Sequence, residues 1–144
     1  MSQIMVGVDG SDESVRTVRW AFAEAKLRRE PVKLVYAIDW YALSEVSLAE
    51  PSADDVDRDV AAILDRTEEA AGGAPDGVGI QREVLHAEDR RGPAGCLLDA
   101  AEREQASMIV VGTRGHRSMF SSSALGWVSH RVLQHAHCPV VVVP

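Results

Sequence analysis

Apolar residues in this chain follow two alternating spacings, and the alternation predicts nine secondary-structure elements. Five short runs are apolar at successive or alternate positions, which is typical of strands. These runs are Gln3–Asp9, Val32–Asp39, Val78–Leu85, Ser107–Val111 and Cys138–Val143. Between them lie four segments whose apolar residues recur every three or four positions, as on one face of a helix. The run at 78–85 has the weakest alternation of the five strands.

Residues at the ends of these segments support the same division. Ser11 and Ser52 can each cap a helix, and Ser52 is followed three positions later by Asp55, as in a capping box with Asp in place of Glu. Pro31 would stop the first helix, and Pro93 suits the first turn of the third. The last helix carries apolar residues from position 125 to position 136.

The resulting order βαβαβαβαβ predicts a fold of the α/β class. Strands that alternate with helices form parallel pairs through right-handed crossovers, with helices on both faces of the sheet. We therefore expect residues 1–144 to form a single Rossmann-like three-layer domain with a five-stranded parallel sheet in the order 3-2-1-4-5. The terminal apolar strand Cys138–Val143 is expected at an edge of that sheet, where an unpaired strand tends to associate with another chain.

Composition narrows the possible partners. The chain has 144 residues, 46% of them hydrophobic, and a formal net charge of −7. An acidic domain of this size is poorly suited to nucleic acid or to an anionic membrane surface. We see no signal peptide and no apolar run long enough to cross a membrane. Cys96 and Cys138 form neither a zinc nor a redox motif, so we expect two buried thiols in a reducing cytoplasm.

The candidate functional residues cluster after the fourth predicted strand. Gly112 and Gly115 are three residues apart, and Gly126 opens the last helix. Arg114 lies between the first and second of these glycines, and Arg117 lies between the second and third. Glycines allow close approach of the backbone to a ligand, a helix N-terminus attracts anions, and arginine adds positive charge. The stretch is therefore suited to binding phosphate groups, as a phosphate cradle does. An ordinary strand-to-helix loop rich in Gly and Ser is the alternative interpretation.

Several segments in order resemble the universal stress protein family over essentially the whole chain. Ile4–Ser11 is similar to the opening strand and turn of that family, and Trp20-Ala21 resembles a pair in its first helix. Gly126–Val143, with its Cys-Pro-Val sequence, resembles the closing helix and strand. The resemblance implies a cytoplasmic stress-response protein with an adenine nucleotide alpha hydrolase-like fold that pairs as a homodimer through Cys138–Val143.

The ATP-binding branch of that family carries a signature of glycine, two residues, glycine, nine residues, glycine, then serine or threonine. Gly112 and Gly115 match the first pair, but ten residues separate Gly115 from Gly126. Trp127 stands where the signature has a hydroxyl residue. Because backbone N–H groups survive any such change, we expect a weakened cradle for ATP, with or without Mg²⁺, and not a lost one.

The resemblance also assigns contacts outside the glycines. It implies that Asp9 contacts the nucleoside and that the backbone of Ala37 holds adenine. Thr113 and Ser129 would assist at the phosphates, and Arg114 or Arg117 would meet the phosphate tail. A capping or turn role is the alternative for Asp9, which precedes Gly10.

No complete catalytic constellation is evident in the sequence. The three histidines at 130, 135 and 137 lack a metal-ligand pattern, and Ser121–Ser123 lack the partners of an acyl-transfer site. Two functions remain: a binding protein that holds ATP or a related adenine nucleotide as a regulatory ligand, or a nucleotide-free homodimeric scaffold of the same fold. Slow ATP hydrolysis would need a positioned water and usually Mg²⁺.

Overall fold

The structure is a computed structural model, and it describes residues 2–40, 52–113 and 126–144. The elements of this part of the chain alternate in the expected order. The strands are β1 (Ile4–Gly7), β2 (Val32–Asp39), β3 (Ile80–Ala87), β4 (Met108–Gly112) and β5 (Val140–Val143). The helices are α1 (Asp12–Arg28), α3 (Ala53–Ala70), α4 (Gly92–Arg103) and α5 (Trp127–His135).

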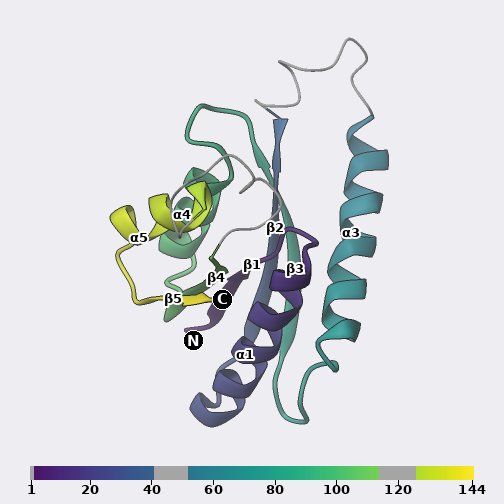
Figure 1. The fold of residues 1–144 in the computed structure, drawn as a ribbon, viewed down its shortest axis with the longest axis vertical. Coiled ribbons are helices and arrows are strands. Elements are labelled where there is room, and N and C mark those ends of the chain that lie inside the picture. Colours follow the sequence, from purple (N-terminus) through teal and green to yellow (C-terminus); the bar gives the residue numbers. More distant parts are fainter. Residues whose placement is uncertain (1, 41–51, 114–125) are drawn as a thin grey trace.

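The strands form one parallel sheet in the order β3-β2-β1-β4-β5, which confirms the predicted topology. Figure 1 shows the sheet between two layers of helix, with α1 and α3 on one side and α4 and α5 on the other. The strand order reverses its direction of growth between β1 and β4. In open sheets of this kind that point leaves a crevice at the carboxyl ends of the strands.

Alternation along the strands builds a core on each face of the sheet. On β1, Ile4 and Val6 are fully buried against the layer of α1 and α3, whereas Met5 is fully buried against the layer of α4 and α5. Strand β4 repeats the pattern with Val110 on the first face and Ile109 on the second. Because successive side chains of a strand point to opposite faces, apolar runs such as these fit only strands that are covered on both sides.

The predicted helix signals are found in place. The Ser11 hydroxyl accepts a hydrogen bond from the Ser14 N–H at 3.2 Å, and the Ser52 hydroxyl accepts one from the Asp55 N–H at 3.2 Å. Pro93 lies in the first turn of α4. These caps fix where α1 and α3 begin. The first turn of α1 also forms part of the wall of a pocket that is described below.

Of the five strands, β2 has the predicted bounds, β1 and β4 are shifted or shortened by one or two residues, and the differences at β3 and β5 have a local cause. β3 begins at Ile80 and not at Val78, because the Val78 N–H donates to the Pro75 carbonyl in a turn at 3.1 Å. β3 then continues to Ala87, since all eight residues of β2 pair with it. β5 begins at Val140, two residues later than expected, because Pro139 has no N–H to donate to a neighbouring strand.

Both cysteines are half-buried, which corrects the expectation of two buried thiols. Burial nevertheless raises the pKa of the Cys96 thiol and of the Cys138 thiol above the ordinary value for cysteine. Neither takes part in a disulfide.

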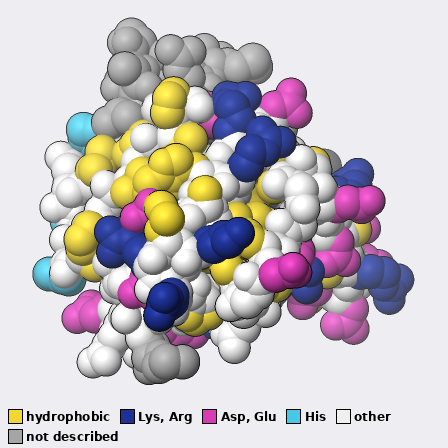
Figure 2. All heavy atoms as spheres, turned by 90° about the horizontal axis from the view of Figure 1, so that it is seen from below, with side chains coloured by type: hydrophobic (Ala, Val, Ile, Leu, Met, Phe, Trp, Pro, Cys, Tyr) yellow, Lys and Arg dark blue, Asp and Glu magenta, His cyan; other side chains and the backbone are white. Residues whose placement is uncertain are grey.

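Charged side chains of both signs are mixed on the end of the molecule seen from below in Figure 2, where hydrophobic side chains also reach the surface. None of the described helices has the length and apolar character needed to cross a membrane.

Candidate functional site

A pocket of about 370 Å³ opens at the carboxyl edge of the sheet. It is lined by the ends of β1, β2 and β4, the first turns of α1, α4 and α5, and one side of α3. It therefore lies at the reversal between β1 and β4, where open α/β sheets bind ligands. Its volume falls within the range of about 300–1,000 Å³ that is usual for small-molecule sites.

Five of the residues selected from the sequence line this pocket: Asp9, Ala37, Gly112, Trp127 and Ser129. Thr113 and Gly126 were also selected but are not among the lining residues; the Thr113 carbonyl accepts a hydrogen bond from the N–H of Gly126. Arg114, Gly115 and Arg117 lie outside the described residues. The structure thus brings together candidates that are more than 100 positions apart in the sequence.

Asp9 fixes the turn between β1 and α1. Its Oδ1 accepts hydrogen bonds from the Ser11 N–H at 2.9 Å, the Ser11 hydroxyl at 2.5 Å and the Ser14 hydroxyl at 2.6 Å. Gly10 supplies the positive φ of 84° that this turn requires. The turn interpretation of Asp9 is therefore correct, and the same residue also lines the pocket.

The hydroxyls expected to assist at a phosphate are bonded within the protein. Ser129 is buried, and its hydroxyl donates to the Gly112 carbonyl. The Thr113 hydroxyl donates to Glu13 Oε1 at 3.0 Å, and the Thr113 N–H donates to the Val143 carbonyl at 3.2 Å. These bonds tie the end of β4 to α1, α5 and β5, so they hold the pocket wall together.

Gly112 is a point of close approach between the backbone and a side chain. A Cβ at this position would clash with the carboxylate of Glu13, and would lie 3.0 Å from Glu13 Cγ. Only glycine fits there without displacing Glu13. The Glu13 side chain therefore lies directly over the first glycine of the motif.

The described lining of the pocket is acidic on its polar side. Asp9, Glu13 and Asp39 contribute carboxylates, and no lysine or arginine is among the described lining residues. Val56, Val60 and Leu97 form part of an apolar wall. A ligand with a flat apolar portion and a polar end would match this division.

Trp127 is the first residue of α5 and borders the pocket with 65% of its surface exposed. The guanidinium carbon of Arg131 lies 5.4 Å from its ring centroid, within the range of a cation–π contact. Because most of the ring is exposed, it stands at the rim of the pocket and does not fill it.

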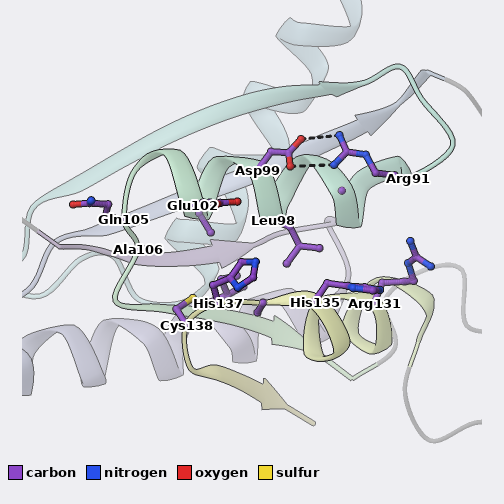
Figure 3. Close-up of a pocket in the computed structure, with 14 residues that line it drawn as sticks. Arg91, Leu98, Asp99, Glu102, Gln105, Ala106, Arg131, His135, His137 and Cys138 are labelled. Carbon is purple, nitrogen blue, oxygen red and sulfur yellow. Dashed lines mark hydrogen bonds and ion pairs between the residues drawn. The ribbon is translucent and has the colours of Figure 1, made fainter.

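A larger cavity of about 540 Å³ lies between α4 and α5. Figure 3 shows Leu98, Arg131 and His135 along it, and Arg91 bound to Asp99 through two hydrogen bonds of 2.7 and 3.0 Å. We assign the functional site to the smaller pocket because the glycine motif, Asp9 and the strand reversal meet there and not here. Within the described part of the chain, no three His, Cys, Asp or Glu residues are grouped so that they could hold a metal ion.

The family model of the "Universal stress protein family" matches residues 1–144. The chain belongs to this family. Universal stress protein Rv2624c of Mycobacterium tuberculosis is 36% identical over 143 residues, which cover 99% of this chain and 48% of that protein. This chain thus spans about half the length of that relative. A universal stress protein of Thermus aquaticus is 34% identical over 97% of this chain and 96% of its own length.

Solved universal stress proteins share the fold over their whole length. The structure of one from Archaeoglobus fulgidus has a TM-score of 0.76 at 25% identity and covers 100% of this chain and 99% of its own. A universal stress protein from Archaeoglobus fulgidus in complex with dAMP has a TM-score of 0.73 at 23% identity, covering 100% of this chain and 98% of its own. A universal stress protein in complex with cAMP has a TM-score of 0.70 at 23% identity, covering 99% of this chain and 96% of its own.

Several lining residues were not predicted from the sequence. Glu13 and Ser14 belong to the first turn of α1, and a Ser-x-x-Ser spacing after Asp9 was the available signal for the serine. Asp39 could have been found by the rule that gave Asp9, because it ends the neighbouring strand. Val56 and Val60 had no such signal, since their apolar spacing predicts only a buried helix face.

Proposed function

We propose that this universal stress protein binds an adenine nucleotide as a regulatory ligand in the pocket at the carboxyl edge of its sheet. The observation that carries the proposal is the convergence of Asp9, Ala37, Gly112 and Trp127 on one pocket at the β1–β4 reversal. ATP, with or without Mg²⁺, is the nucleotide that the glycine signature favours.

Related structures and the lining of the pocket itself support an adenine ligand. Universal stress proteins of the same fold have been solved with cAMP and with dAMP, which share an adenine base. The apolar wall of this pocket, which includes Val56 and Val60, offers such a base a dry surface, and Asp9 lies at its polar side. Pockets of mainly apolar lining with a few polar groups are the usual form of small-molecule sites.

Filling the pocket tests its assignment. Ala37→Leu places three additional carbons at the wall where adenine would lie, so we expect it to abolish retention of AMP in equilibrium dialysis. Ala23→Leu makes the same chemical change at an exposed position of α1 and should retain AMP as the parent does. Retention by Ala37→Leu at the parental level, with circular dichroism showing an intact fold, would contradict the assignment.

A nucleotide-free homodimeric scaffold is the second candidate, and two observations favour it. The hydroxyls of Thr113 and Ser129 already have partners within the protein. Strand β5 is an edge strand, and all four of its residues are half-exposed in the single chain. Edge strands of this kind pair readily with another chain. On this account two copies would associate through β5 whether or not a nucleotide is bound.

We further propose a cytoplasmic protein that binds its ligand without turning it over. Its ATP, if bound, should then be recovered intact after prolonged incubation. Release of inorganic phosphate in excess over the protein would contradict this and indicate a hydrolytic site.

A further inference from the structure

The Cα of Gly112 faces a carboxylate. Gly112 ends β4 and is the first glycine of the motif, the point at which the backbone can come closest to a ligand. In this structure the close approach is made by Glu13, whose carboxylate would have to move if Gly112 carried a Cβ. Within the described part of the chain, the three heavy atoms nearest to a Cβ placed on Gly112 all belong to Glu13.

Glu13 is held in this position from both ends. Its backbone lies in the first turn of α1, where the helix dipole stabilises negative charge. Its Oε1 accepts a hydrogen bond of 3.0 Å from the Thr113 hydroxyl, so the carboxylate is anchored to the end of β4. Glu13 is half-buried and lines the pocket beside Asp9.

A phosphate over Gly112 and the carboxylate of Glu13 compete for the same place. A phosphate placed over Gly112 would need the space that the Glu13 carboxylate occupies, so it would have to displace that carboxylate from the Thr113 hydroxyl or lie beside its negative charge. A nucleoside on the apolar wall formed by Val56 and Val60 makes no such demand.

We propose that Glu13 determines the ligand specificity of the pocket by disfavouring polyphosphates, so that adenosine or AMP binds more tightly than ATP. This inference rests on the proposed binding of adenine nucleotides. On this proposal Glu13 discriminates between ligands by their number of phosphates. The residue responsible lies in the first turn of α1 and is not one of the glycines of the motif.

Calorimetric titration of four proteins with adenosine, AMP and ATP tests the proposal. Glu13→Gln removes the charge and keeps the size of the side chain, whereas Glu13→Ala also clears the space over Gly112. Asp12→Asn is the matched control, because Asp12 is the neighbouring carboxylate in the same helical turn but is exposed and does not line the pocket. Circular dichroism confirms that each variant keeps its fold.

We expect both Glu13 variants to raise ATP affinity by about tenfold, equivalent to roughly 1.4 kcal/mol, relative to adenosine. Adenosine affinity should stay close to that of the parent, and Asp12→Asn should leave the ratio of ATP to adenosine affinity unchanged. If both Glu13 variants still bind adenosine and keep the parental ratio of ATP to adenosine affinity, the role of Glu13 is overturned but the proposed function is not. Loss of all three ligands from the parent would overturn the proposed function together with this inference.

Discussion

At the scale of single residues, the pocket is organised by groups that serve the fold and the site together. Asp9 holds the turn into α1 through Ser11 and Ser14 while it lines the pocket. Ser129 holds α5 to the end of β4 through the Gly112 carbonyl. Hydroxyls with such partners contribute to a ligand only if the ligand replaces the bonds they already make, which reduces the net gain.

Trp127→Ser should tighten ATP binding several-fold, because it restores the hydroxyl that the family signature has at this position. A neutral hydrogen bond contributes about 0.5–1.5 kcal/mol. The change also removes the contact between the ring and Arg131, so it is compared with Leu133→Ser, which alters another exposed apolar residue of α5 outside the pocket. Calorimetric titration with ATP gives the comparison, and equal affinities for the two variants would show that position 127 does not contact the ligand.

Sequence reasoning found Asp9 because it ends a strand and Gly112 because it begins the glycine motif, whereas Ala37 came only from the family resemblance. It missed Glu13, because the importance of that side chain comes from its contact with Thr113, which is 100 positions away. Contacts between distant residues depend on how the helices pack, and one chain without relatives carries no signal for them.

At the scale of secondary-structure elements, a charged cluster joins β2, β3 and the end of α4. Lys33 is 8% exposed, and its Nζ lies 2.5 Å from Glu83 Oε2 and also binds the carboxylate of Glu104. Gln3 donates a further hydrogen bond to Glu104 at 3.0 Å. Burial lowers the pKa of Lys33, but the hydrogen bonds to Glu104 and Glu83 outweigh it, so the pKa of the amine is raised.

Lys33→Met should lower the free energy of unfolding by about 3 kcal/mol, because it leaves two carboxylates together without their cation. Lys26→Met is the control: Lys26 is the other lysine of the chain, is exposed on α1, and should cost less than about 0.5 kcal/mol when replaced. Urea unfolding at neutral pH measures both. A loss at Lys33 no greater than that at Lys26 would contradict the cluster's contribution.

The difference in unfolding free energy between the parent and Lys33→Met has a defined pH dependence. Because the pKa of Lys33 is raised in the folded state, its contribution is fully present below the unfolded-state pKa of about 10.4 and is lost as pH rises through the higher folded-state value. From neutral pH upward, the stability difference between the parent and Lys33→Met should therefore stay constant up to about pH 10 and shrink above it. The sequence offered one signal for this cluster, a lysine within the apolar run Val32–Asp39.

Element boundaries were predictable where local chemistry sets them. Ser11 and Ser52 cap their helices as expected, since a cap depends on residues three positions apart. The predicted ends of β3 were wrong by two residues. The observed ends are set by pairing with all eight residues of β2 and not by the weak alternation of β3 itself.

At the scale of the whole molecule, the five-stranded order was predictable because few topologies satisfy the rules for parallel crossovers. The sheet leaves β3 and β5 at its edges. β5 has four consecutive valines, of which Val141 packs toward the layer of α1 and Val142 toward that of α5. Such a strand is suited to pairing with its copy in an isologous dimer.

Val141→Glu should convert the proposed homodimer to monomers, because it places a charge on the pairing strand of both copies. Val141→Thr keeps the β-branched shape without charge and should remain dimeric. Sedimentation velocity at micromolar concentration distinguishes the two states, with thermal unfolding as a check on the fold. A monomeric parent under the same conditions would rule out the β5 dimer.

The central claim is that the carboxyl-edge pocket takes an adenine nucleotide, and titration calorimetry of the unaltered protein with AMP and with ATP tests it most directly. The account predicts saturable binding at one site per chain for both ligands at submillimolar concentration, with AMP the tighter of the two. Absence of binding by either ligand up to millimolar concentration, with an intact fold by circular dichroism, would contradict it and favour the nucleotide-free scaffold.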